Sequence, residues 1–436
     1  MIRLLQSRLR PASVAGAGSA ALLRLLQSRL RLLRRRVGRR AAGYDPVLIG
    51  SAVALAGLGV LLVGAATQRH GLVFAVRQFV WVIAGLGVLG LTAVVDLSTV
   101  RRRANALYLG GLALLVLVLS PLGSATNGSQ AWFSVGPLAL QPAEVMKPLL
   151  VVGLAAHGAR AGGPLDGRRL AGALLLVGVP VGLMLLQPDL GTAMVLVSLA
   201  VGVVAVAGAR VRHLALLGLL GIVGVVGVLR AGVLAPYQVE RLTGFLHQST
   251  DPQGASWNLE QAKIAIGSGG LAGEGLFSGS QTRLAYVPEQ HTDFVFTVVG
   301  EELGLVGGAT VLGLFGLLTW RIWRAAWRST DPFGALCCAG VLAMLVFQVT
   351  ENVGMTMGIT PITGIPLPFL SYGGSSMLSC FAAVGLAANV ARSCRKETAR
   401  QSGRTSRRPD LPLAVSSSSP IGPRYCFVLR PCERQI

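Results

Sequence analysis

An aspartate at the edge of an apolar segment is the strongest candidate for chemistry in this chain. Asp293 follows the polar run 288–292 and directly precedes a long apolar stretch. A carboxylate that loses part of its water becomes more basic, so Asp293 could act as a general base toward a hydroxyl group. Aspartate is also a favoured N-cap residue, and the sequence alone leaves a helix cap as the alternative.

Glu144 and Lys147 form a second candidate pair, at the start of another apolar segment. Their spacing places both side chains on one face of a helix. They could form a structural ion pair that satisfies two charges in apolar surroundings, or they could present a cation to an anionic substrate. Both interpretations stay open at this stage.

Two further polar features adjoin apolar segments. Arg77 and Gln78 stand at one end of a predicted helix, where Arg77 either extends toward lipid headgroups or holds a phosphate. The run 361–376 is apolar yet rich in Pro and Gly, so it cannot form a regular membrane helix. Irregular backbone at membrane depth is tolerated where it is buried in protein or lines a wet cavity. We therefore predict a re-entrant-like loop that walls a substrate groove, with a plain external linker as the alternative.

The composition indicates which elements must position these residues. Of the 436 residues, 52% are hydrophobic and only 13% are charged. A soluble domain usually carries about a quarter of its residues as charges. This composition excludes most soluble folds and predicts an all-α polytopic membrane protein.

Hydropathy predicts ten transmembrane helices, because each needs about 20 mostly apolar residues. The expected segments are 48–67, 78–95, 105–121, 144–158, 170–186, 191–208, 213–230, 294–320, 333–352 and 376–391. A large outer loop, 231–293, separates the seventh helix from the eighth, and the Pro/Gly-rich loop separates the ninth from the tenth. The membrane domain then spans residues 45–391.

The positive charge lies mainly in two tails. The chain has 39 Lys and Arg against 18 Asp and Glu, a net charge of +21. Eleven arginines fall in residues 1–44, and residues 392–436 are also strongly basic. A nucleic-acid binder would carry its cations on a folded face, so we expect no nucleic acid partner. The positive-inside rule instead predicts that both termini are cytoplasmic. The N-tail is an amphipathic helix or a disordered basic arm, and the C-tail reads as disordered.

The sequence gives little support for a metal site or a nucleotide-binding site. The His and Cys residues are scattered without zinc spacing, so no metal site built from protein ligands is expected. The Gly-rich run 267–272 partly imitates a dinucleotide fingerprint, but it lies in the large loop without a βαβ context.

Five segments of the chain resemble the shape, elongation, division and sporulation family, which comprises RodA, FtsW and SpoVE. They are NGSQAWFSVGPLALQPAEVMK (127–147), QPDLGTA (187–193), IAIGSGGLAGEG (264–275), PEQHTDFVFTVVGEELGLVG (288–307) and NVGMTMGITPITGIPLPFLSYGGSS (352–376). The resemblance covers nearly all of 45–391. One position departs from it, because many FtsW-like members have Arg where this chain has Ala131. That departure favours the RodA-like branch.

The resemblance implies an inverting peptidoglycan glycosyltransferase that polymerises lipid II into glycan strands at the outer face of the bacterial cytoplasmic membrane. Asp293 matches the family's catalytic aspartate. Charge on the substrate diphosphate would be neutralised by Lys147 and Arg77, or by a divalent cation that the substrate carries in; no resident cofactor is implied. Further residues are taken as substrate-binding candidates, namely Glu144, Gln78, His291 and Ser371.

The resemblance also implies partners and leaves two rival functions. The expected partners are a class B penicillin-binding protein, which is a transpeptidase, and other membrane proteins of the elongation or division machinery. A lipid II flippase would use a similar bundle, although we find no inverted repeats in the sequence. A non-catalytic scaffold would need no base at Asp293.

Overall fold

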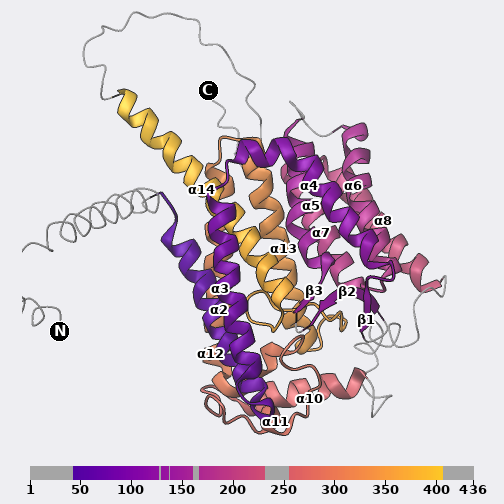
Figure 1. The fold of residues 1–436 in the computed structure, drawn as a ribbon, viewed down its shortest axis with the longest axis vertical. Coiled ribbons are helices and arrows are strands. Elements are labelled where there is room, and N and C mark those ends of the chain that lie inside the picture. Colours follow the sequence, from indigo (N-terminus) through magenta and orange to yellow (C-terminus); the bar gives the residue numbers. More distant parts are fainter. Residues whose placement is uncertain (1–42, 127–128, 137, 161–165, 231–254, 406–436) are drawn as a thin grey trace, which may run out of the picture. The chain divides into compact units, whose positions relative to one another are not determined.

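The computed structural model of the chain describes residues 43–126, 129–136, 138–160, 166–230 and 255–405. The part from Asp45 onward forms one compact unit, in which long helices lie side by side (Figure 1). Apolar side chains fill the space between them, so the predicted all-α architecture is confirmed.

Within the described ranges, each of the ten predicted segments coincides with a long helix. These helices are α2 (Pro46–Ala66), α3 (Val73–Val94), α4 (Leu97–Val118), α5 (Pro142–Ala159), α6 (Gly167–Leu186), α7 (Leu190–Val206), α8 (Val211–Arg230), α12 (Val295–Arg328), α13 (Pro332–Thr356) and α14 (Gly374–Thr405). By length and composition, six of them could cross a membrane, namely α2, α3, α6, α12, α13 and the Gly374–Arg395 part of α14. The count of ten spans stays a prediction.

The shorter elements gather at one end of the helix bundle, which we call the loop end (Figure 1). They are the 3-10 turn η1 (Gln68–His70), the antiparallel sheet of β1 (Ser124–Thr126), β2 (Ser129–Val135) and β3 (Leu138–Leu140), and the helices α10 (Ala255–Ser268) and α11 (Ser280–Leu284). The segment 357–373, between α13 and α14, also lies there. We call the opposite end, which carries the short α3–α4 and α12–α13 connections, the turn end.

The last helix is longer than the sequence analysis predicted. Helix α14 continues to Thr405, so residues 392–405 are helical and the expectation of disorder from 392 onward is wrong for them. The run 392–402 contains neither Gly nor Pro, so nothing in the sequence ends the helix after the apolar part. Arg395 of this extension lies 3.8 Å from Asp45, which caps α2.

Three expectations concern residues outside the described ranges. They are the amphipathic helix or basic arm within residues 1–42, the first part of the large loop at 231–254, and the C-tail at 406–436.

Helix α12 is interrupted at Gly304, near the loop end. Gly304 has φ 63° and ψ −161°, a conformation that residues with a side chain rarely adopt. In an unbroken helix, the N–H groups of residues 305 and 306 would bond to the carbonyls of 301 and 302. The kink breaks both bonds, which leaves two donors and two acceptors without their usual partners.

The glycine-rich segment 270–275 supplies all four missing partners. The Leu305 and Val306 N–H groups donate to Gly270 and Leu271 carbonyl oxygens at 3.0 and 3.1 Å. In return, the N–H groups of 274 and 275 donate to the carbonyl oxygens of 301 and 302 at 2.9 and 3.1 Å. A Cβ added at Gly273 would lie 2.2 Å from the carbonyl oxygen of residue 302, so the backbones could not approach with a side chain there. Gly270 and Leu271, at the end of the run that imitates a nucleotide motif, therefore serve backbone docking.

Candidate functional site

The loop between α13 and α14 is fixed to α3 through a buried amide. Gln78 is fully buried, and its Nε2 donates to the Ser371 carbonyl oxygen at 3.0 Å. Its Oε1 accepts from the Gly373 N–H at 3.4 Å. Ser371 is itself buried, and its hydroxyl oxygen accepts from the Leu367 N–H at 2.8 Å. Gln78 and Ser371 thus hold the loop's shape, whereas the neighbouring Arg77 is exposed.

The run that carries Asp293 is fixed to the same loop. The Asn352 Nδ2 of α13 donates to the Asp293 carbonyl oxygen at 2.7 Å and to the Ile365 carbonyl oxygen at 2.8 Å. The Tyr372 N–H donates to the His291 carbonyl oxygen at 2.8 Å. Asp293 is half-buried. The N-cap residue of α12 is Phe294, so the interpretation of Asp293 as the cap is wrong.

His291 lies in an aromatic cluster. Its ring centroid lies 5.3 Å from that of Phe74 on α3 and 5.6 Å from that of Tyr372 in the loop, and Phe74 and Tyr372 are 5.1 Å apart. The two contacts of Phe74 are edge-to-face, an arrangement that stabilises packed aromatic side chains. The cluster therefore ties three separate segments together beside Asp293.

Glu144 and Lys147 form the ion pair that their spacing predicted. The Lys147 Nζ lies 2.6 Å from the Glu144 Oε1, and the two side chains are only 1% and 3% exposed. Two charges without water are tolerated because each neutralises the other. In this arrangement the ammonium group faces its carboxylate partner and is shielded from solvent.

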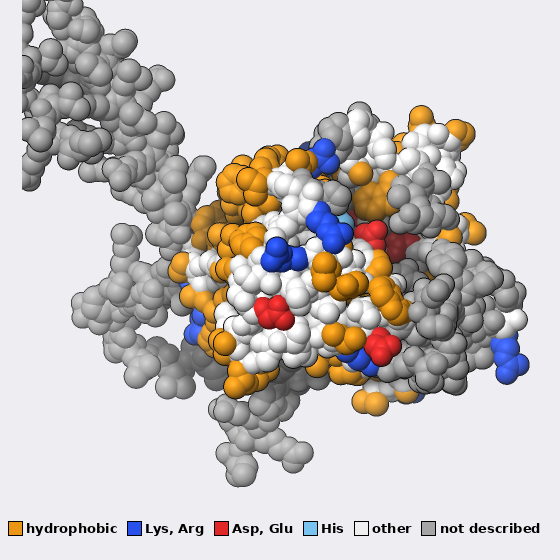
Figure 2. All heavy atoms as spheres, turned by 90° about the horizontal axis from the view of Figure 1, so that it is seen from below, with side chains coloured by type: hydrophobic (Ala, Val, Ile, Leu, Met, Phe, Trp, Pro, Cys, Tyr) orange, Lys and Arg blue, Asp and Glu red, His pale blue; other side chains and the backbone are white. Residues whose placement is uncertain are grey.

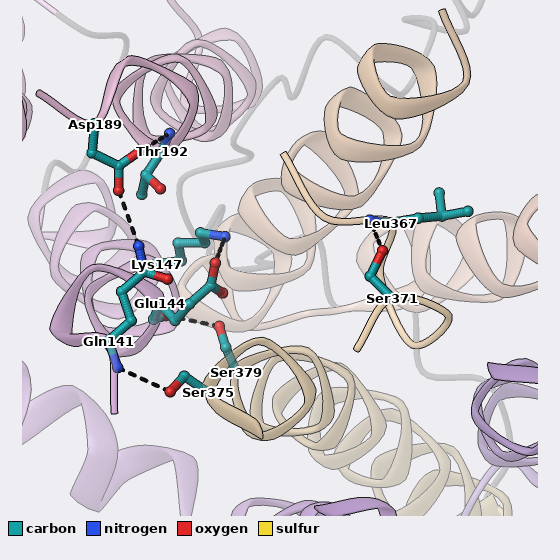
Figure 3. A network of polar contacts seen from close by, with 9 residues as sticks. All are labelled: Gln141, Glu144, Lys147, Asp189, Thr192, Leu367, Ser371, Ser375 and Ser379. Atoms are coloured by element: carbon teal, nitrogen blue, oxygen red, sulfur yellow. Dashed lines mark hydrogen bonds and ion pairs between the residues drawn. The ribbon is translucent and has the colours of Figure 1, made fainter. Parts of the chain in front are cut away.

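The first turn of α5, which carries this pair, is anchored to two other helices (Figure 3). The Gln141 Nε2 donates to the Asp189 Oδ2 at 3.1 Å, and Asp189 also caps α7. The Gln141 N–H donates to the Ser375 Oγ at 2.9 Å, and the Ser379 Oγ donates to the Glu144 carbonyl oxygen at 2.8 Å. Residues of α14 and α7 therefore set the position of the ion pair.

The loop and its flanking residues connect nearly all the predicted site residues. Direct hydrogen bonds link 365–379 to Gln78, to the 291–293 run and to the start of α5. Arg77 is the exception, since its exposed side chain joins none of these contacts. Sequence reasoning missed several positioning residues, namely Asn352, Asp189, Ser375 and Ser379. Each of them is a polar side chain within or beside an apolar helix, where such residues are rare, and that position could have marked them in the sequence as candidates.

The surface of the loop end bears few charges. Figure 2 looks onto this end and shows mostly apolar and uncharged surface, with isolated basic and acidic side chains. In the described part of the chain, no group of three or more His, Cys, Asp and Glu side chains could hold a metal ion. A half-buried carboxylate and a buried ion pair that lie at the same end of an apolar bundle can provide a base and a cation there.

Fold and site together define a multi-pass helical membrane protein with a polar site at one end. The profile of the family described as "Cell cycle protein", which comprises FtsW, RodA and SpoVE, matches residues 48–396. The chain belongs to this family.

Relatives of known sequence are similar over most of their length. Stage V sporulation protein E of Bacillus subtilis (strain 168) is 38% identical, over 74% of this chain and 88% of the relative. The probable peptidoglycan glycosyltransferase FtsW of Thioalkalivibrio sulfidiphilus is 39% identical, over 81% of this chain and 91% of the relative.

Solved structures agree with this membership. A chain from a structure described as the coordination of polymerization and crosslinking by a peptidoglycan synthase complex matches with a TM-score of 0.70 and 36% identity, over 80% of this chain and 98% of that one. The rod shape determining protein RodA of Thermus thermophilus matches with a TM-score of 0.60 and 33% identity, over 80% of this chain and 97% of that one. Because these relatives carry the names SpoVE, FtsW and RodA, the RodA-like branch stays a prediction.

Proposed function

We propose that this protein is a peptidoglycan glycosyltransferase that polymerises lipid II. The observation that carries the proposal is the segment 361–376. Its irregular part is hydrogen-bonded to α3 and to the run of Asp293, and Ser375, in the first turn of α14, is hydrogen-bonded to the start of α5. This segment thereby organises a half-buried carboxylate and a buried cation at the same end of the bundle. The relatives named peptidoglycan glycosyltransferase FtsW support the same activity.

Asp293 is the general base in this proposal. It takes the proton from the GlcNAc 4-hydroxyl of the incoming lipid II while that oxygen attacks the MurNAc anomeric carbon of the growing chain. The bond from the anomeric carbon to the diphosphate breaks, and the configuration at that carbon inverts. A positioned base accelerates such a step by roughly 10² to 10⁴. Asn352, which binds the Asp293 carbonyl oxygen, fixes the backbone that presents the base.

Cations stabilise the leaving diphosphate. Arg77 is exposed at the loop end and is available to a substrate from the start. Lys147 contributes once its ammonium turns from Glu144 toward the diphosphate, and a divalent cation that arrives with the substrate can share this charge. Glu144, Gln78, His291 and Ser371 act as positioning residues that hold these groups and the loop.

The proposed orientation puts the loop end outside the cytoplasmic membrane and both termini inside. The Arg-rich turn end supports it, because basic residues favour the cytoplasmic side. The natural partner is a class B penicillin-binding protein, together with further membrane proteins of the elongation or division machinery. The likeness to a chain of a peptidoglycan synthase complex supports such a partner.

The function is tested by supplying purified lipid II to the purified protein and measuring the glycan strands that form. The measurement is made with and without a class B penicillin-binding protein. The proposal predicts glycan strands, in larger amount with the partner. Liposomes that carry lipid II in one leaflet discriminate the flippase, which would move lipid II without making glycan. A scaffold would do neither, and normal growth of cells that carry Asp293→Ala at native expression would favour it.

A further inference from the structure

Gln348 of α13 is a buried amide that the mechanism above does not use. Its side chain is fully buried, and neither Nε2 nor Oε1 has a hydrogen-bond partner among the described residues. An amide left without partners in the interior destabilises the folded chain. A glutamine at this position therefore needs a reason other than stability in the state that the structure describes.

The helix register places Gln348 level with the ion pair. A Cβ added at Gly340 of α13 would lie 3.0 Å from both methyl groups of Val151 on α5 and 2.9 Å from a methyl group of Val203 on α7, so Gly340 packs against both helices. Helices α5 and α13 are antiparallel, since Gly158 of α5 meets Leu336 of α13. Two turns from Val151 along α5 lead to Glu144, and about two turns from Gly340 along α13 lead to Gln348.

The rotation of α13 directs Gln348 toward the same place. Gly340 faces the side of α13 that packs on α5 and α7, and Gly334 faces Val390 of α14. At 3.6 residues per turn, Gln348 projects between these two directions, which is where Glu144 of α5 and Ser379 of α14 meet. The Glu144 Oε2 is also buried without a partner among the described residues.

We propose that Gln348 is a positioning residue that holds Glu144 when Lys147 leaves it to bind the substrate diphosphate. Lys147 cannot meet a substrate while it is buried against the Glu144 Oε1, and its departure would leave a carboxylate unpaired in the interior. The Gln348 Nε2 is a donor of the right kind at the right level to replace it. No bond is made or broken in this exchange, and the inference rests on the function proposed above.

Gln348 also lies on the side of α13 that carries Asn352, which contacts the backbone of the proposed base Asp293. Asn352 lies one turn further along α13 on the same side, and its Oδ1 has no hydrogen-bond partner among the described residues. Its Nδ2 already binds the Asp293 carbonyl oxygen at 2.7 Å. The side chains of Glu144, Gln348 and Asn352 therefore line one route from the ion pair to the backbone of Asp293.

Lipid II binding to the purified full-length protein in detergent, measured without turnover, tests this role through Gln348→Met. Methionine has a similar size and lacks the amide, so the melting temperature should stay the same or rise. The dissociation constant for lipid II should increase by about tenfold, since a hydrogen bond to a carboxylate is lost in the bound state only. Asn389→Leu is the control: it removes a buried amide that binds backbone carbonyls of residues 92 and 95 at the turn end. It should lower the melting temperature and leave the dissociation constant unchanged.

Two results would overturn the inference: a dissociation constant for Gln348→Met within about twofold of wild type, or a loss of affinity that only accompanies a lower melting temperature. The proposed function fails separately. If the wild type binds lipid II and Gln348→Met binds it weakly, but the wild type makes no glycan with its partner, the function is wrong and the positioning role stands.

Discussion

At the scale of single residues, Glu144 and Lys147 form a buried ion pair. The spacing alone predicted the contact, because residues three apart share a helix face. It could not predict how deeply the pair is buried, since that depends on α7 and α14, which anchor the first turn of α5. The same limit applies to Asn352, whose two acceptors come from distant parts of the chain.

Removal of the lysine should affect stability and activity separately. Lys147→Met leaves the Glu144 carboxylate unpaired in the interior, so the free energy of unfolding should fall by about 3–5 kcal/mol and polymerisation should stop. The double variant Glu144→Gln, Lys147→Met removes both charges and should recover most of that stability but no activity. Thermal melting and lipid II polymerisation measure the two effects. A double variant as active as wild type would reduce the pair to a structural contact.

At the scale of elements, two irregular segments shape the loop end. The sequence predicted an irregular loop over 361–376 because Pro and Gly disfavour a helix there; the structure is irregular to 373, and α14 begins at Gly374. The sequence did not predict that segment 270–275 repairs the break in α12, because the hydrogen bonds join residues about thirty positions apart in the chain. The hairpin of β1 and β2 was also missed, although the Asn-Gly dipeptide at 127–128 is a known hairpin signal.

Glycine at the break in α12 should be indispensable. An alanine Cβ at Gly304 would lie 2.4 Å from the Gly273 nitrogen, and φ of 63° is unfavourable for alanine. Gly304→Ala should therefore lower the free energy of unfolding by more than about 1 kcal/mol. Gly313→Ala in the same helix is the matched control, because nothing lies within 4 Å of its added Cβ. It should leave thermal stability unchanged or raise it, and equal melting temperatures for the two variants would contradict the docking of segment 270–275.

The loop between α13 and α14 should depend on Gln78. Gln78→Leu removes the hydrogen bonds to the backbone of Ser371 and Gly373, so hydrogen exchange at residues 371–373 should accelerate and polymerisation should decrease. Arg77→Ala changes an exposed neighbour and should leave that exchange unchanged. If exchange in the loop is the same in Gln78→Leu as in wild type, the buried amide does not hold the loop.

At the scale of the whole molecule, the charge distribution predicts the orientation in the membrane. The two basic tails and the Arg-rich turn end should face the cytoplasm, and the loop end should face outward. A membrane-impermeant thiol reagent should therefore label Leu284→Cys in intact cells, and should label Arg102→Cys only after the membrane is opened. Both side chains are exposed. The reverse labelling pattern would contradict the orientation.

The account as a whole rests on Asp293 as the base, and the polymerisation rate of Asp293→Asn tests it most directly. Asparagine keeps the size and the backbone contact with Asn352 but cannot accept the proton. The purified variant, with its partner and with lipid II, should bind substrate and melt as the wild type does, while its rate falls by roughly 10² or more. A rate near that of the wild type would show that Asp293 is not the base.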